Sequence, residues 1–246
     1  MPYLERMTFT GVDERTDIAE LLILHNKFAE DRYNSKIIEF GFLYSHNDQG
    51  KQNKYPSFSF LTKMGKLNKA LDLNFALHLC GTAASSYLFE EDTELTELAG
   101  RFTRVQLNIN GNKLQKEGID NTVLAEKIVE GNHSLPEIIL QCNSVNEWLC
   151  TLLNSLENYD PNLLFDTSGG LGKSPDSWPK PLNQSYCSYA GGLGPDTLMQ
   201  DLLDISKVTG GCIEGIDMES KVRTNDWFDL YKVKTCLDIW DKFNEV

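Results

Sequence analysis

Short apolar segments of strand length alternate with segments of helical periodicity along the chain. The expected strands cover residues 7–11, 37–44, 74–81, 104–109, 137–142, 163–165, 186–190 and 215–218. The expected helices cover residues 18–29, 57–71, 82–89, 92–99, 121–130, 145–156, 196–205 and 228–243. Such sustained alternation implies parallel strands joined by helical crossovers.

Two architectures can use this alternation, and the position of the glycine-rich segments separates them. A doubly wound open sheet normally carries its phosphate loop after the first strand, whereas the glycine-rich segments here come late, after the sixth and seventh expected strands. A chain of 246 residues matches the roughly 250 residues typical of an α/β barrel, although length alone also allows two small domains. The sequence therefore predicts an α/β fold, a single (β/α)8 TIM barrel domain over residues 1–246.

The last three strands each end in a loop suited to binding an anion. Glycine lets the backbone approach a ligand closely and present its N–H groups, and barrels often hold a phosphate on their later loops. Lys173 would add a point charge, or it could be solvated on its loop. The expected phosphate-binding residues are Gly170, Gly172, Lys173, Gly191, Gly192, Glu219 and Ser220.

Composition limits the partners and the compartment. The net charge of −13 argues against binding a nucleic-acid backbone, which needs a basic face, but a local pocket can still bind a phosphorylated small molecule. The six cysteines are scattered without a C-x-x-C pair, which favours reduced, buried thiols. No segment has the length of a signal peptide or a membrane span. We therefore expect a cytoplasmic protein with no membrane contact, no metal and no cofactor.

Three motifs in residues 164–222 resemble those of one enzyme family. They are LFDT with the GGLGK loop and Trp178 beyond it, AGGLGPD over residues 190–196, and IDMESKV over residues 216–222. In these motifs the chain resembles phosphoribosylanthranilate isomerase, a (β/α)8 barrel enzyme of tryptophan biosynthesis. Weaker similarities are found at residues 9–11, 54–56 and 105–108.

The resemblance implies an acid–base site that is only partly retained. The family uses an aspartate general acid after the sixth strand, which corresponds to Asp166, and a cysteine general base after the first strand, where this chain has Thr10. A hydroxyl is a poor base at neutral pH without an activating partner. The family's histidine on the fourth strand corresponds to Asn108. The resemblance thus supports ligand recognition more strongly than the family's reaction.

Other polar residues near the expected barrel mouth are candidates for the site. His78 would be the best substitute base if it reaches the pocket, and Asp13 would be a second one if its loop folds inward. His78 could equally be a buried structural histidine. Neutral amides are better suited to reading hydroxyl groups than to proton transfer. The expected ligand-binding residues are Thr10, Lys54, Gln106, Asn108, Gln141 and Arg223, the last of which could instead pair with Glu219.

Two functions remain open from the sequence. The first is a non-catalytic protein that sequesters or senses a phosphorylated ribose-like or nucleotide-like molecule. The second is an isomerase or lyase that acts on a phosphorylated sugar or phosphoribosyl derivative, with Asp166 as general acid. The oligomeric state is not indicated.

Overall fold

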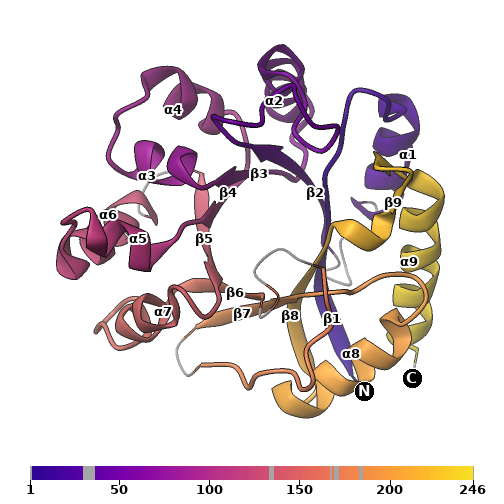
Figure 1. The fold of residues 1–246 in the computed structure, drawn as a ribbon. Helices are drawn as coiled ribbons and strands as arrows, with labels where there is room; N and C mark the ends of the chain where they lie inside the picture. Colours follow the sequence, from indigo (N-terminus) through magenta and orange to yellow (C-terminus); the bar gives the residue numbers. More distant parts are fainter. Residues whose placement is uncertain are drawn as a thin grey trace.

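A closed parallel barrel forms the centre of the computed structural model, which describes residues 2–29, 37–132, 136–166, 168, 172–182 and 185–245. The strands pair in chain order, and β8 closes the ring against β1. Figure 1 shows the ring with the helices arranged around its outside. The strands are β1 (Tyr3–Thr10), β2 (Ile37–Tyr44), β3 (Phe75–Cys80), β4 (Arg104–Asn108), β5 (Glu137–Cys142), β6 (Asn162–Asp166), β7 (Tyr186–Ala190) and β8 (Cys212–Met218). The expected (β/α)8 TIM barrel is confirmed.

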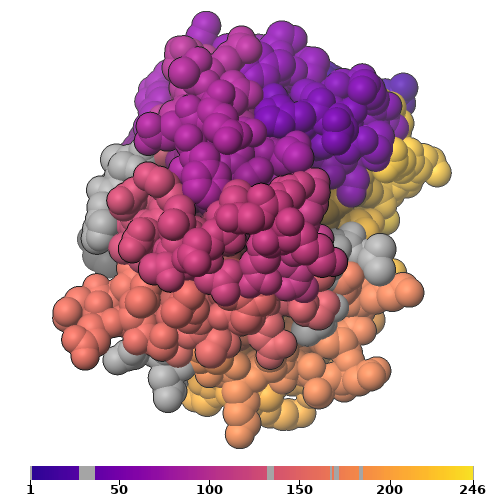
Figure 2. Space-filling model, turned by 60° about the vertical axis from the view of Figure 1, so that its left-hand side comes forward, coloured from indigo at the N-terminus to yellow at the C-terminus, as the bar shows by residue number. Residues whose placement is uncertain are grey.

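The helices cover the outer surface of the strands, and Figure 2 shows the side of the molecule on which the middle of the chain packs. They are α1 (Ile18–Ala29), α2 (Phe58–Leu71), α3 (Thr82–Leu88), α4 (Thr93–Ala99), α5 (Gly111–Lys116), α6 (Asn121–Asn132), α7 (Glu147–Asn154), α8 (Leu198–Thr209) and α9 (Leu230–Phe243). No helix within the described ranges has the length and apolar character needed to span a bilayer.

Elements absent from the sequence prediction occur in the loops that follow β4 and β8. Helix α5 begins after Asn110, whose side chain accepts a hydrogen bond from the amide of Lys113 at 3.0 Å. After β8 come the 3₁₀ turn η1 (Ser220–Val222) and the hairpin of β9 (Arg223–Thr224) with β10 (Trp227–Phe228). Phe228 belongs to this hairpin, so the last helix begins at Leu230 rather than at residue 228.

Side chains alternate between the inside and the outside of the barrel because successive residues of a strand point to opposite faces. The outward side chains are apolar and pack beneath the helices, as in the contact between Phe42 and Phe75, whose ring centroids are 5.0 Å apart. Full burial of one such side chain stabilises the fold by about 1.5–3 kcal/mol. Many inward side chains are polar, including Thr8, Glu39 and Arg104.

A buried ion pair crosses the barrel interior below the mouth. Arg104 donates to Glu39 at 2.6 Å, and Thr8 donates to the same carboxylate oxygen at 2.9 Å. Burial alone disfavours the charged form of Glu39, but the positive charges of Arg104 and Arg6 outweigh it and hold the pKa of Glu39 below its ordinary value. Charged and polar side chains therefore occupy part of the barrel interior below the mouth.

Candidate functional site

A pocket opens at the carboxyl-terminal mouth of the barrel. This is the end at which the active sites of such barrels lie. Most of the residues expected from the sequence line it. They are Thr10, His78, Gln106, Asn108, Gln141, Asp166, Gly172, Gly191, Gly192, Glu219 and Ser220.

Asp166 ends β6 and is almost completely buried. Its Oδ2 accepts a hydrogen bond from Gln141 Nε2 at 2.7 Å, and its Oδ1 accepts from the amide and the hydroxyl of Ser168 at 3.1 and 2.6 Å. Gln141 is held in turn by Asn143, whose Nδ2 donates to Gln141 Oε1 at 3.3 Å. Asp166 is therefore a fixed acceptor on one wall of the pocket.

The loops after β6, β7 and β8 meet beside this wall. Gly192 has a φ of +68°, and a Cβ at this position would lie 2.5 Å from the amide nitrogen of Ser174. A Cβ at Gly172 would overlap the hydroxyl of Ser220. Only glycine fits both positions, because both the backbone conformation and the close approach exclude a side chain. Lys173 is exposed and does not line the pocket, and Gly170 lies outside the described residues.

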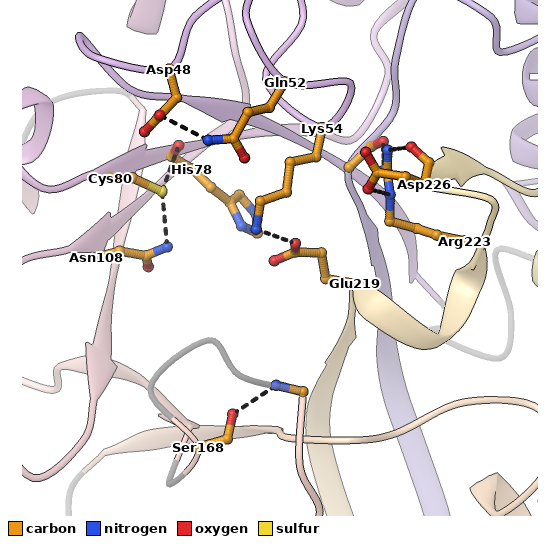
Figure 3. A network of polar contacts seen from close by, with 12 residues as sticks. Asp48, Gln52, Lys54, His78, Cys80, Asn108, Ser168, Glu219, Arg223 and Asp226 are labelled. Carbon is orange, nitrogen blue, oxygen red and sulfur yellow. Dashed lines mark hydrogen bonds and ion pairs between the residues drawn. The ribbon is translucent and has the colours of Figure 1, made fainter.

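The loop after β2 reaches over the pocket. Lys54 Nζ lies 2.9 Å from Glu219 Oε1, and Figure 3 shows the two side chains extending toward each other. This pairing neutralises a carboxylate that would otherwise repel a phosphate. Lys54 does not itself line the pocket wall, so its position is that of a partly buried cation at the rim.

Asp13 and Arg223 are not part of the pocket, contrary to the sequence prediction. Asp13 is fully buried, and its Oδ2 lies 3.2 Å from Arg223 Nη2. Arg223 is also buried and contacts Asp13 rather than Glu219, the alternative partner suggested by the sequence. Neither charge faces the mouth, so Asp13 is unsuited to act as a base and Arg223 to bind a second anion.

Polar side chains from β3 and β4 form the opposite wall. Gln106 Nε2 donates to Asn108 Oδ1 at 2.9 Å. Asn108 Nδ2 in turn donates to Cys80 Sγ at 3.6 Å, a contact that Figure 3 shows. His78 lies deeper, and burial lowers its pKa to about 3. Its ring is therefore neutral at physiological pH, and within the described residues its Nε2 has no hydrogen-bond partner.

Solved structures similar to this chain include N-(5'-phosphoribosyl)anthranilate isomerase from Pyrococcus furiosus. That protein is 15% identical, with a TM-score of 0.55 over 98% of this chain and 100% of its own. Phosphoribosyl anthranilate isomerase from Thermococcus kodakaraensis is 13% identical, with a TM-score of 0.52 over 97% of this chain and 98% of its own. The chain has the fold of phosphoribosylanthranilate isomerase. No protein-family model and no curated protein sequence matches it.

Asp217 is a pocket residue that sequence reasoning missed. It lies on β8, and its Oδ1 accepts a hydrogen bond from Thr10 Oγ1 at 2.6 Å. Burial raises the pKa of Asp217 to about 7, against the opposing effect of the Thr10 hydroxyl. Thr10 occupies the position at which the resemblance to phosphoribosylanthranilate isomerase implies a cysteine base. The isolated carboxylate within an apolar strand was a signal for Asp217, but its partner lies on β1 at the other end of the chain.

Among the described side chains, no group of three or more His, Cys, Asp or Glu residues is arranged to hold a metal ion. The polar side chains that line the pocket carry carboxyl, amide, hydroxyl and imidazole groups, and glycines of the later loops lie beside them. Such a set can bind hydroxyl groups and a phosphate, and its carboxyls can exchange protons with a ligand.

Proposed function

We propose that this protein binds a phosphorylated ribose-like or nucleotide-like small molecule in the barrel mouth. The observation that carries the proposal is the convergence of Gly172, Gly192 and Ser220 from three successive loops. The backbone N–H of Gly192 and the serine hydroxyl can donate to phosphate oxygens. Gly172 donates its own N–H to Ser168 Oγ at 3.2 Å and contributes by leaving the space free of a side chain.

The rest of the pocket suits the sugar part of such a ligand. Carboxylate and amide oxygens accept hydrogen bonds from hydroxyl groups, and amide nitrogens donate to them. Asp166 and Gln141 offer these groups on one wall, while Gln106 and Asn108 offer them on the other. Phosphorylated ribose has both an anionic end and several hydroxyl groups, so it matches the two halves of the pocket.

Two roles are compatible with this ligand. A sequestering or sensing role is supported by Thr10 and Asn108, which stand where the isomerase resemblance implies a cysteine and a histidine. An isomerase or lyase role is supported by Asp166, and additionally by Asp217, because the latter places a second carboxyl in the same pocket. By resemblance alone, Asp166 would be the general acid in this second role.

Calorimetric titration with D-ribose 5-phosphate tests the binding proposal, with unphosphorylated D-ribose as the ligand control. We expect Gly192→Ala to weaken binding of the phosphorylated sugar by about tenfold or more, because the new Cβ displaces the loop at Ser174. Gly210→Ala is the matched variant, since its φ of +74° is similarly unfavourable for alanine but nothing lies within 4 Å of the new Cβ. If the two variants bind D-ribose 5-phosphate with the same affinity, the proposed phosphate site is contradicted.

Mass spectrometry of the same mixtures separates the two roles. A sequestering protein would return unchanged D-ribose 5-phosphate after prolonged incubation and denaturation. An isomerase acting on this sugar would return a mixture of aldose and ketose phosphates. The Asp166→Asn variant is the control, because conversion that survives it does not arise at this site.

A further inference from the structure

Asp166 and Asp217 face the pocket from the two strands that flank β7. Both residues are in register with Ala190, Asp166 from β6 and Asp217 from β8. Two strand spacings of about 4.8 Å place their Cα atoms roughly 10 Å apart. The methyl group of Ala190 leaves the space between the two carboxyls open, and all three residues line the pocket. A ligand resting on Ala190 can contact both carboxyl groups.

Hydrogen-bond donors surround both carboxyl oxygens of Asp166. Gln141 donates to one of its oxygens, and the amide and hydroxyl of Ser168 donate to the other. A carboxylate accepts hydrogen bonds at both oxygens, whereas protonation converts one of them into a donor that would face an existing N–H or O–H group. The arrangement is therefore that of a proton acceptor.

Asp217 has the opposite surroundings. Its side chain is 12% exposed, and Thr10 supplies the hydrogen bond to Oδ1. Among the described residues, the imidazole near Asp217 is that of His78, whose Nδ1 is 4.0 Å from Asp217 Oδ2 and whose burial disfavours its charged form. Charged groups of both signs affect the pKa of the Asp217 carboxyl. They are Glu219 just after β8, Glu39 on β2 and Arg104 on β4, while Lys54 is paired with Glu219.

We propose that Asp217 is the proton donor and Asp166 the proton acceptor for a phosphorylated sugar with an open-chain carbonyl. This assignment reverses the acid role that the resemblance implies for Asp166. Two carboxyls held in different environments commonly divide the acid and base roles. These two differ in their hydrogen bonds, since donors occupy both oxygens of Asp166, whereas Thr10 donates to Oδ1 of Asp217. The inference rests on the proposed ligand site, since the sugar must lie between β6 and β8 for both carboxyls to reach it.

The proton transfers balance without an oxidant or reductant. The Asp166 carboxylate takes the proton from the carbon next to the carbonyl, and the electron pair of the broken C–H bond forms a C=C bond. The carbonyl π electrons move to oxygen, which takes the proton from Asp217 and gives an enediol. In the second half, the protonated Asp166 returns a proton to the former carbonyl carbon. The Asp217 carboxylate takes the proton of the neighbouring hydroxyl, so an aldose becomes a ketose.

Hydrogen exchange at C2 of D-ribose 5-phosphate in D₂O, followed by proton NMR, tests the assignment. We expect exchange in the wild type and a loss of roughly a hundredfold or more in both Asp166→Asn and Asp217→Asn. Calorimetric titration of the same variants shows whether they still bind the sugar. Binding without any exchange in the wild type would overturn the proton-transfer inference and leave the binding proposal standing.

The pH dependence distinguishes the proposed roles from their reverse. If Asp217 is the donor, the exchange rate falls as pH rises through about 7, because the donor becomes ionised. A rate that rises through this range would make Asp217 the base and overturn the assignment. Thr10→Val removes a hydrogen bond that favours the ionised form, so it should move the falling limb to higher pH, and Thr10→Ser should restore the wild-type profile.

Carbon-13 NMR of labelled aspartate carboxyls provides a readout that needs no ligand. The signal that disappears in Asp217→Asn is expected to titrate near pH 7 in the wild type. An Asp217 signal that titrates below about pH 5, near the usual aspartate range, would overturn the assignment even if D-ribose 5-phosphate does not bind.

Discussion

Arg223 and Asp13 form a buried ion pair, with 3.2 Å between Nη2 and Oδ2, although 210 positions separate them in the chain. The guanidinium also donates to the carbonyl oxygens of Gly11 and Asp226, at 2.5 and 2.7 Å. The amide of Phe228 donates to the same Asp13 oxygen at 2.8 Å. Because β1 and β8 are neighbours where the barrel closes, this cluster links the loop after β1 to the loop after β8.

Removal of one partner of this pair should be strongly destabilising. Asp13→Ala would leave the Arg223 charge buried without its carboxylate, and we expect the free energy of unfolding to fall by about 3–5 kcal/mol. Asp226→Asn is the matched variant, because Asp226 is 64% exposed and asparagine tolerates its φ of +63°. Its effect should stay below about 1 kcal/mol. Urea denaturation at pH 7 measures both, and equal effects would show that the buried pair contributes little.

The Glu39–Arg104 pair in the barrel interior should show strong coupling. Arg104→Met alone leaves a buried carboxylate and should lower the free energy of unfolding by about 3–5 kcal/mol. The double variant Glu39→Met with Arg104→Met removes both charges at similar volume, and it should be more stable than Arg104→Met alone. A double-mutant cycle by urea denaturation measures the coupling, and additive effects would contradict it.

The sequence predicted the barrel because the strand signal is local. In β2, the alternation of Glu39 with Phe40 and Phe42 already separates an inward from an outward face. Helix α5 escaped prediction because its six residues contain a single large apolar residue, Leu114. The first strand was predicted too short because Arg6 points to the polar lower opening of the barrel and interrupts the apolar pattern.

The sequence predicted the site residues correctly only where the position of a residue on its strand determines which way its side chain points. Asp166 and Asn108 end strands, and Gln106 lies two residues before Asn108 on the same face of β4, so all three face the pocket, as expected. Asp13 and Arg223 lie in loops, whose course depends on contacts between distant segments, so the sequence could not show that they pair. The environment of Asp217 depends on its hydrogen bond with Thr10, a residue 207 positions away. No local sequence pattern indicates that these two residues are in contact.

His78 should make the protein sensitive to acid. Its pKa is about 3 in the folded protein against 6.5 for an ordinary histidine, mainly because of burial. The stability from the neutral ring is present above pH 6.5 and is lost as pH falls toward 3, by up to about 1.4 kcal/mol per pH unit. His78→Gln should therefore reduce the loss of unfolding free energy between pH 7 and pH 5. His46→Gln, at a half-buried surface position, should change it little, and an unchanged acid dependence in His78→Gln would contradict the prediction.

Asp217 should have the opposite pH dependence. Its pKa is about 7 in the folded protein against 3.8 for an ordinary aspartate, mainly because burial disfavours the charge. The stability from the protonated form is fully present below pH 3.8 and is lost as pH rises through about 7. Asparagine stays neutral, so Asp217→Asn should gain stability relative to the wild type between pH 4 and pH 8, by on the order of 2–4 kcal/mol.

Urea denaturation across this pH range measures the Asp217 effect, with Asp238→Asn at an exposed position of α9 as the control. The control should follow the wild-type curve at every pH. Parallel curves for Asp217→Asn and the wild type would mean that Asp217 is ionised in the folded protein at all these pH values. Such a result would also remove the proton that the acid role of Asp217 requires, so this stability measurement bears directly on the chemistry at the mouth.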